Sequence, residues 1–307
     1  MQSQTTIALE AIIQPEFAGC RLDQTLAQLF PDYSRERLKT WVLAGQCHVN
    51  GNVLRPKDKV AGGEQVTINA VVEAAVTWEA EDLPLDIIYE DEDLIVINKS
   101  AGVVVHPAAG NYAGTLVNAL LNHAPELNQV PRAGIVHRLD KDTTGLLVVA
   151  KNLTAHTSLV NQLQARTVTR IYEAIVHGLF LAGSSISEPI GRHPRDRKKM
   201  AVIGDGKPAV THYRVLQKFA KNTHIQVQLE TGRTHQIRVH MAHVKHPLVG
   251  DQTYAPRIQH KFPRQALHAR SLSLIHPRTG LEIGWETTIP ADMQNLIKDL
   301  SGCNNNI

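Results

Sequence analysis

Cysteine, long apolar runs and a leader-like segment are scarce or missing in this chain of 307 residues. Its three cysteines, Cys20, Cys47 and Cys303, are too few and too widely spaced for a disulfide framework or a zinc knuckle, which favours a reducing compartment. No apolar run approaches the roughly 18 residues that a membrane-spanning helix needs. Residues 1–10 show no basic stretch followed by an apolar one, as a secretory signal would. We therefore expect a cytoplasmic protein with no membrane partner.

Net charge and aromatic content are also low. Lysine and arginine total 32 against 29 acidic residues, a formal charge of +3, so a polyanionic partner would be recognised by local basic clusters. Aromatic residues make up 5% of the chain, which limits the side chains on which a base could stack. The 43% hydrophobic and 20% charged content is ordinary for a globular protein and argues against a mainly disordered chain. The length predicts about two domains.

The front of the chain predicts a short tail, residues 1–14, followed by a small module over residues 15–74. Apolar residues at helical spacing predict a helix over 21–30, and Ser34 is a suitable N-cap for a second helix. Asn50-Gly51 then marks a turn between short strands. The module therefore contains two helices followed by strands.

The second of these helices begins with three basic residues, Arg35, Arg37 and Lys39, which could contact phosphates. They could equally form a solvated face, because residues 15–65 hold seven basic and six acidic residues. The order of features is more specific than the charge. Arg21-Leu22-Asp23, then Ser34-Arg35, then two glycine turns resemble the S4 domain, a small RNA-binding module.

The rest of the chain predicts a linker and a larger domain. Residues 75–84 are acidic and poor in pattern, and we interpret them as the linker. Within residues 85–307, buried-strand runs such as 94–97 alternate with helical spacing such as 153–165. Since there is no internal repeat and no sustained β-α-β alternation, we predict an α+β domain.

Residues 132–151 concentrate candidate catalytic groups. Asp140 and Asp142 precede an apolar strand run and have basic residues on both sides, which is a typical position for a catalytic carboxylate. The same aspartates could instead accept hydrogen bonds from backbone amides in an Asx-turn, which is the commoner role for such residues. This segment alone leaves both interpretations open.

Residues 229–240 form a second candidate segment, in which a strand ends and a helix predicted over 234–244 begins. Arg233 could keep a carboxylate ionised or bind a phosphate. The alternative is that Arg238 and the histidines of this segment only pack and solvate a surface helix. His240, His243 and His246 lie at i, i+3 spacing, but no cysteine or acid accompanies them, so we predict no metal site.

Residues 192–202 hold the strongest basic run of the chain. Five basic residues accompany Asp196 in what is predicted to be an exposed loop or hairpin tip leading into a strand: Arg192, Arg195, Arg197, Lys198 and Lys199. Such a projection suits phosphate contacts. A solvated loop is the alternative.

Four motifs together resemble the RluA family of pseudouridine synthases. They are residues 98–107 (NKSAGVVVHP), 137–145 (HRLDKDTTG), 170–174 (RIYEA) and 231–238 (TGRTHQIR). The resemblance covers residues 85–290. It implies an α+β fold in which a catalytic domain with a mixed, largely antiparallel sheet follows a small S4-type α/β RNA-binding domain.

The resemblance also implies an activity, the isomerisation of uridine to pseudouridine without cofactor or metal. The S4-like module matches the subgroup that acts on large-subunit ribosomal RNA. We therefore expect a stem-loop of 23S rRNA as the substrate, met free or in pre-50S particles. We expect the protein to be a monomer without an obligate protein partner.

The motifs imply roles for individual residues. Asp140 matches the catalytic carboxylate, Arg233 is the implied cation that keeps it ionised, and Tyr172 matches a tyrosine that stacks on the base and serves in proton transfer. Arg138 could fill the gap left by a flipped nucleotide or bind its phosphate. Three further residues of the motifs are expected to contact substrate: His137, Thr144 and Ile237.

Two other functions compete with this one. A glycosidase would use two carboxylates at least about 5 Å apart, whereas Asp140 and Asp142 are two positions apart in the sequence. A non-catalytic ribosome-assembly factor would bind RNA through the same S4-like module. A mere binding protein has no need to combine Asp140, Tyr172 and Arg233, so we favour the enzyme.

Overall fold

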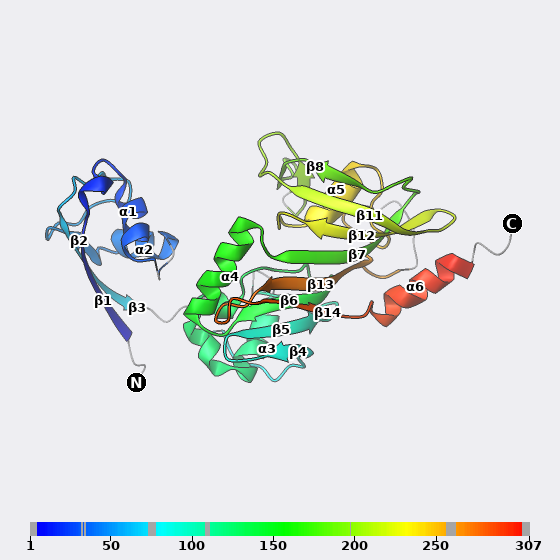
Figure 1. Cartoon of the computed structure of the whole chain (residues 1–307), viewed down its shortest axis with the longest axis horizontal. Helices are drawn as coiled ribbons and strands as arrows, with labels where there is room; N and C mark the ends of the chain where they lie inside the picture. The colour runs from blue at the N-terminus through cyan, green and yellow to red at the C-terminus, as the bar shows by residue number, and fades with distance from the viewer. Residues whose placement is uncertain are drawn as a thin grey trace. The chain divides into compact units, whose positions relative to one another are not determined.

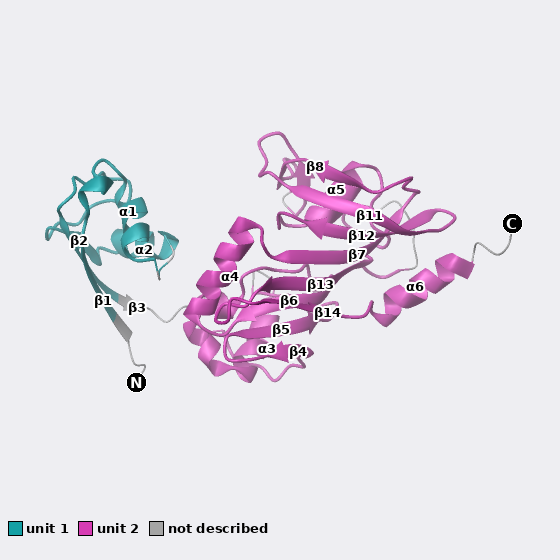
Figure 2. Ribbon diagram, in the orientation of Figure 1, with its two compact units in different colours: residues 1–77 teal, residues 78–307 magenta. Residues whose placement is uncertain are grey.

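The computed structural model describes residues 5–31, 33, 35–72, 78–107, 111–196, 198–255 and 262–302. The chain forms two compact units, Met1–Thr77 and Trp78–Ile307 (Figure 2). Among the described residues, no helix combines the length and the apolar character needed to cross a membrane.

The smaller unit packs two helices on a three-stranded antiparallel sheet of order β1-β3-β2. Its elements are β1 (Thr5–Ile12), η1 (Pro15–Phe17), α1 (Leu22–Leu29), α2 (Arg35–Leu43), β2 (Cys47–Val49) and β3 (Gln65–Val72). Both predicted helices are therefore present. Leu22 and Leu26 of α1 and Leu38 of α2 are fully buried in the core of this unit.

The prediction of a tail over residues 1–14 was wrong, because β1 is part of this sheet. It pairs with β3 along its whole length, from Thr5 opposite Val72 to Ile12 opposite Gln65. Ile7, Leu9 and Ala11 alternate with exposed residues and pack against the core, which is the pattern of a strand with one buried face.

The larger unit is built on a nine-stranded sheet of order β4-β5-β6-β13-β7-β12-β11-β8, with β14 paired to β13 (Figure 1). Its elements are β4 (Ile87–Glu90), β5 (Leu94–Lys99), α3 (Leu116–His123), η2 (Pro125–Gln129), η3 (Pro131–Gly134), β6 (Thr144–Ala150), α4 (Leu153–Ala165), β7 (Thr169–His177), β8 (Ser184–Ser187), β9 (Ile190–Arg192), β10 (Met200–Val202), β11 (Val210–Lys218), β12 (Asn222–Leu229), α5 (Gln236–His243), β13 (Leu267–Ile275), β14 (Glu282–Glu286) and α6 (Ala291–Gly302). Within the described residues only β6 and β13 pair in parallel, which confirms a mixed, largely antiparallel sheet.

Helices cover both faces of this sheet, and the strands beneath them are apolar on both sides. In β5, Ile95 and Ile97 belong to the main core together with α3 and α5. Leu94 and Val96 belong to a second core together with α4. Because side chains alternate along a strand, a continuous apolar run is what two covered faces require.

Part of the predicted linker 75–84 belongs to the larger unit. The side-chain amide of Asn118, in α3, donates to the main-chain carbonyl of Glu79 (2.7 Å). The main-chain carbonyl of Asn118 accepts from the amide of Glu81 (3.0 Å). Trp78 packs edge-on against His106, with 4.7 Å between ring centroids. Residues 78–84 are therefore packed on the larger unit and are not a linker, although their composition is acidic. Residues 75–77 lie outside the described part of the chain.

Candidate active site

A pocket of about 580 Å³ opens over β7, one of the central strands of the larger unit. Its walls come from the loop before β6, the end of α4, the start of β7 and the segment from β12 into α5. The lining residues are Arg132, Val136, His137, Arg138, Leu139, Asp140, Thr143, Val160, Leu163, Gln164, Arg166, Arg170, Tyr172, Leu229, Glu230, Thr231, Gly232, Arg233, Thr234, His235, Gln236, Ile237, Arg238 and Leu267. Six of them are arginines and two are carboxylates, so the pocket suits an anionic ligand.

Asp140 lines this pocket, in the loop that leads into β6. Its Oδ2 accepts a hydrogen bond from Nη1 of Arg238 (3.0 Å), and its Oδ1 lies 3.8 Å from Nε2 of His235. Only its main-chain carbonyl takes part in the local turn, by accepting from the amide of Thr143 (3.0 Å). Its carboxylate therefore faces side chains of α5, unlike an Asx-turn aspartate.

The loop reaches this position through Gly145, the second residue of β6. Its φ is +109°, and a Cβ there would lie 2.2 Å from the carbonyl oxygen of Ala269 in β13. Only glycine allows β6 and β13 to approach this closely.

The cation that contacts Asp140 is Arg238, and the prediction of Arg233 for this role was wrong. Arg238 also donates two hydrogen bonds to Asp251, from Nε (2.7 Å) and Nη2 (2.9 Å), and lies over the ring of Tyr254. Arg233 precedes the helix, and its Nε donates to the carbonyl of Pro208 (3.1 Å).

The physical reason lies in where α5 begins. His235 is the N-cap in a left-handed conformation (φ +57°), so the first helical turn starts at Gln236 and places Arg238 on the buried side. His235 and Arg238 are three residues apart, and both approach the carboxylate of Asp140 from the start of α5. That i, i+3 pair was the sequence signal that could have identified Arg238.

Tyr172 and two apolar residues complete the surroundings of the carboxylate. Tyr172, in the middle of β7, is buried, and this burial raises the pKa of its phenol, which therefore stays protonated at neutral pH. Ile237 and Leu139 also line the pocket and are buried. A planar ring, a carboxylate and apolar walls thus lie together, as predicted for Asp140, Tyr172 and Ile237.

Comparison with known proteins identifies the family. A family model described as RNA pseudouridylate synthase matches residues 93–243, and an S4 domain model matches residues 20–66. The ribosomal large subunit pseudouridine synthase D of Pseudomonas aeruginosa is 57% identical over 290 residues, 90% of this chain and 91% of that protein. The chain belongs to the RNA pseudouridylate synthase family. The predicted family, S4 domain and enzyme class are therefore confirmed.

Other relatives of this synthase agree. The protein of the same name from Escherichia coli K12 is 54% identical over 306 residues, 95% of this chain and 94% of that one. Among solved structures, human RNA pseudouridylate synthase domain containing 1 matches 72% of this chain and 96% of its own, with 27% identity and a TM-score of 0.54. Human RNA pseudouridylate synthase domain containing 4 matches 70% and 92%, with 25% identity and a TM-score of 0.57.

Two further residues of the synthase motifs, Arg138 and His137, line the pocket. Arg138 is exposed, whereas His137 is half-buried. Burial and the charge of Arg170 lower the pKa of His137 to about 3, so its imidazole is neutral. Its Nε2 accepts from the amide of Val148 (3.2 Å), which leaves the proton on Nδ1.

Thr144 does not line the pocket, contrary to its predicted role. Its side chain is buried, and its hydroxyl lies 2.9 Å from Nδ1 of His268. Thr143 lines the pocket instead. The physical reason is that Thr144 is the first residue of β6. Side chains alternate between the two faces of a strand, and that of Thr144 lies on a buried face, against His268 of β13.

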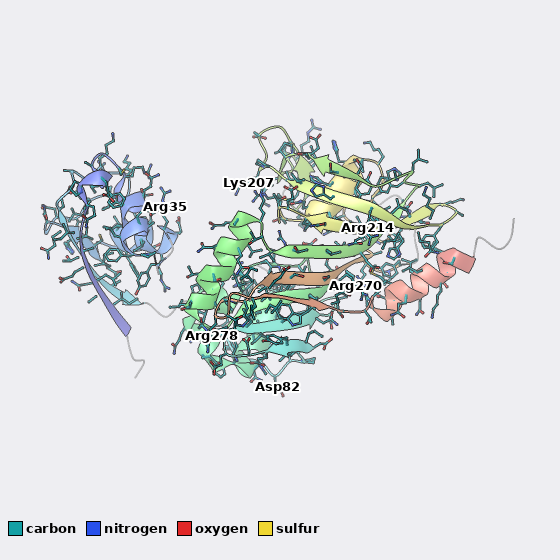
Figure 3. All side chains as sticks on the ribbon, viewed as in Figure 1. Arg35, Asp82, Lys207, Arg214, Arg270 and Arg278 are labelled. Carbon is teal, nitrogen blue, oxygen red and sulfur yellow. The ribbon has the colours of Figure 1, made fainter. Side chains whose placement is uncertain are left out.

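The predicted RNA-contacting residues of the S4 unit have local partners. Arg35, labelled on the smaller unit in Figure 3, donates to Asp23 from Nε (3.0 Å) and Nη2 (2.6 Å). Arg37 lies over the ring of Trp41, and Lys39 pairs with Glu36 (3.2 Å). These side chains remain partly exposed, so their predicted contact with RNA stays a prediction.

The basic run 192–202 forms the predicted hairpin, in which β9 and β10 pair with Met200 opposite Arg192. Arg192, Arg195 and Lys198 are exposed and Lys199 is half-buried, whereas Arg197 lies outside the described residues. The base of the hairpin is joined to the pocket, because the Tyr254 hydroxyl accepts from the amide of Met200 (3.0 Å) and lies 2.8 Å from Nδ1 of His235.

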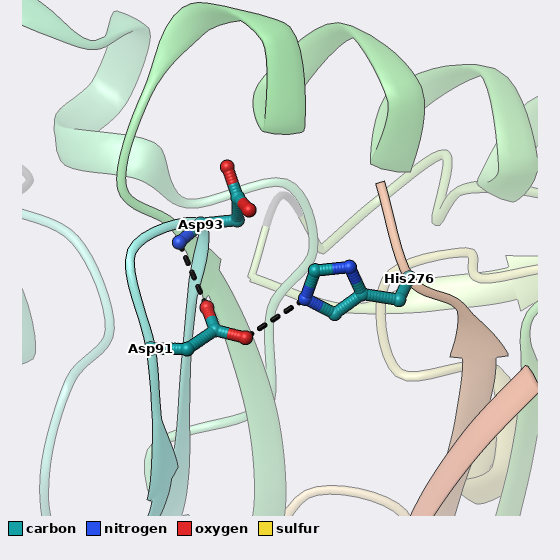
Figure 4. A group of neighbouring side chains, drawn as sticks. All are labelled: Asp91, Asp93 and His276. Carbon is teal, nitrogen blue, oxygen red and sulfur yellow. Dashed lines mark hydrogen bonds and ion pairs between the residues drawn. The ribbon is translucent and has the colours of Figure 1, made fainter. Parts of the chain in front are cut away.

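Asp91, Asp93 and His276 form the one group within the described residues whose side chains are close enough to share a metal ion (Figure 4). Their polar atoms already have partners. Nδ1 of His276 accepts from two backbone amides, so its Nε2 carries the proton that is donated to Asp91 (2.8 Å). Asp93 pairs with Arg278 (2.7 Å). We interpret the group as a structural junction between β4–β5 and the end of β13.

Lys99, in the first motif, holds the loop that carries Asp140 in place. Its ammonium group is buried and donates to the carbonyls of Ser100 (2.8 Å), Val103 (2.9 Å) and Lys141 (2.8 Å). Lys141 follows Asp140 directly. Burial lowers the pKa of Lys99 to about 8, so the ammonium form with three donors still predominates at pH 7.

We expect Lys99→Met to lower the free energy of unfolding by about 3 kcal/mol at pH 7, because three carbonyls lose their donor. Since the pKa of Lys99 is lower in the folded protein than in the unfolded chain, its contribution to stability rises with pH between about 8 and 10.5. The difference between wild type and variant in urea unfolding will therefore widen over that interval. Lys141→Met removes an exposed side chain of the same loop and is the control; equal losses in both variants would disprove the role of Lys99.

Proposed function

We propose that this synthase converts specific uridines of large-subunit (23S) ribosomal RNA into pseudouridine, with Asp140 as the catalytic carboxylate. The observation that carries the proposal is the Asp140–Arg238 pair beside Tyr172 in a pocket rich in arginine. The relatives at 53–57% identity, named ribosomal large subunit pseudouridine synthase D, support the choice of RNA. We infer that the substrate is a 23S rRNA stem-loop, met free or in pre-50S particles, and that the enzyme acts as a cytoplasmic monomer.

The reaction changes four bonds. The N1–C1′ bond of uridine breaks, C5 bonds to C1′, the proton on C5 leaves, and N1 gains a proton. No atom or electron is added overall, so the reaction requires no cofactor. The site must supply a carboxylate, a proton-transfer group and a surface that holds the detached base.

The described geometry supports these roles. Asp140 is held by the hydrogen bond from Arg238 and lines the pocket that a flipped nucleotide would fill. Tyr172 offers a ring for stacking and a protonated hydroxyl for proton transfer. Leu139 and Ile237 exclude water, which would otherwise hydrolyse the nucleotide at C1′.

The second carboxylate of the pocket argues against a glycosidase. Glu230 is bound by Arg166 (3.2 Å) and His212 (2.7 Å), and these partners lower the pKa of its carboxyl group. A general acid needs a raised pKa. Asp142 does not line the pocket. The arrangement therefore supports rearrangement within the RNA over hydrolysis.

The proposal is tested by incubating the purified protein with unmodified 23S and 16S rRNA transcripts and mapping pseudouridine by carbodiimide-dependent reverse-transcription stops. We expect a few discrete sites in 23S rRNA and none in 16S rRNA. Conversion of 16S rRNA alone, or none at all, would contradict the proposal. A variant that lacks residues 1–77 loses a unit with its own core; we expect it to convert uridines with weaker or broader site selection.

A further inference from the structure

Arg170, at the start of β7, is a buried cation without a counter-charge. It is 7% exposed, and its Nε is a buried nitrogen without a hydrogen-bond partner. Within the described part of the chain, its guanidinium makes no hydrogen bond and no ion pair. Burying an unpaired charge is costly unless a partner arrives. This free-energy cost of burial suggests that Arg170 binds an anion that the protein itself does not supply.

The pocket offers Arg170 no internal anion. Its two carboxylates are engaged elsewhere, Asp140 with Arg238 and Glu230 with Arg166. Nearby His137 is neutral, partly because of the charge of Arg170 itself. The missing anion must therefore come from the ligand that fills the pocket.

Gly232 provides the space in which the guanidinium lies. A Cβ at Gly232 would be 2.8 Å from Nη1 of Arg170, closer than real side chains allow. The backbone of Gly232 is not in the left-handed region, so its conformation does not demand glycine. The absence of a side chain there serves to admit the guanidinium to the pocket.

The position of Arg170 relative to Tyr172 indicates which anion it meets. The two residues are two positions apart on β7, on the same face and about 7 Å apart along the strand, and both line the pocket. A nucleotide whose base lies against Tyr172 carries its phosphate on the far side of its ribose. We propose that Arg170 binds a backbone phosphate of the RNA next to the flipped nucleotide. The inference rests on RNA being the substrate, as proposed above.

Arg170→Met tests the proposal, because it keeps the length of the side chain and removes the charge. We expect RNA affinity to fall about tenfold and the slope of log K against log salt to become shallower by about 0.7 to 0.9, the loss of one phosphate contact. We also expect the unfolding temperature of the free protein to stay equal or rise, since an unpaired buried charge is removed.

Arg214→Met is the matched control. Arg214 lies on β11 outside the pocket, where its Nε donates to Gln226 (Figure 3). The substitution removes the same charge, so we expect a slope within about 0.3 of wild type. An equal loss of slope in both variants would show a general charge effect and overturn the proposal.

Gly232→Ala provides a second test that leaves every charge in place. Its methyl group displaces the guanidinium, so we expect weaker RNA binding, and no further loss when Arg170→Met is added.

Two results for Arg170→Met would overturn the proposal and leave Arg170 with a structural role only. One is an unchanged salt slope with unchanged RNA affinity, and the other is a lower unfolding temperature with an unchanged salt slope. If the wild type failed to convert 23S rRNA, the proposed function would be refuted. The salt slopes of RNA binding in wild type and variants could still be compared.

Discussion

Asp140→Asn will abolish pseudouridine formation while RNA affinity stays within about twofold of wild type. The asparagine keeps an oxygen that can accept from Nη1 of Arg238, so the pocket retains its shape. It removes the charge and nucleophilicity of the carboxylate, and such losses cost about four orders of magnitude or more in other enzymes. The measurement is single-turnover conversion of a 23S rRNA fragment, with affinity determined by filter binding on the same RNA.

Asp142→Asn is the matched control for this variant. Asp142 lies in the same loop two residues away, carries the same charge and does not line the pocket. Its backbone carbonyl accepts from Arg264 (3.1 Å), a contact that the substitution leaves in place. We expect its rate to stay within about threefold of wild type. If Asp140→Asn converted uridine as fast as Asp142→Asn does, Asp140 would have no role in the chemistry.

Those parts of the site that depend on one short segment could be predicted from the sequence. Asp140 and Tyr172 each occupy a motif whose strand and turn signals are local, and both line the pocket. The strand 94–97 could be predicted for the same reason, because an apolar run of that length must be covered on both faces. Local pattern was enough wherever the environment of a residue followed from its neighbours in the chain.

The missed features depend on how distant segments meet. The role of Arg238 depends on the residue at which α5 begins and on Asp251, thirteen positions away. β1 was missed because its burial is only partial and its partner β3 lies some sixty residues later. The role of Lys99 could not be predicted either, because its three acceptors include a carbonyl 42 residues away. No local pattern encodes such contacts.

Arg238→Met will destabilise the protein by about 3 to 5 kcal/mol and abolish activity, whereas Arg233→Met will leave the orientation of Asp140 intact. Arg238 is 7% exposed at its side chain and Asp251 is 0% exposed, so the variant leaves a buried carboxylate without its cation. Burial alone would lower the pKa of Arg238, but hydrogen bonds and charges from Asp251 and Asp140 outweigh it and raise that pKa. The cation is therefore charged at every pH at which the protein folds.

The double variant Arg238→Met, Asp251→Asn separates stability from function. Asparagine at 251 still accepts from the amides of Thr253 (2.9 Å) and Tyr254 (3.0 Å), and no unpaired carboxylate remains at that position. We expect most of the lost free energy of unfolding to return in urea titrations, because removing both members of a buried ion pair costs far less than removing one. Activity will not return, because Asp140 still lacks the hydrogen bond that orients it. Recovery of pseudouridine formation together with stability would show that Arg238 only supports the fold and that the orientation of Asp140 does not depend on it.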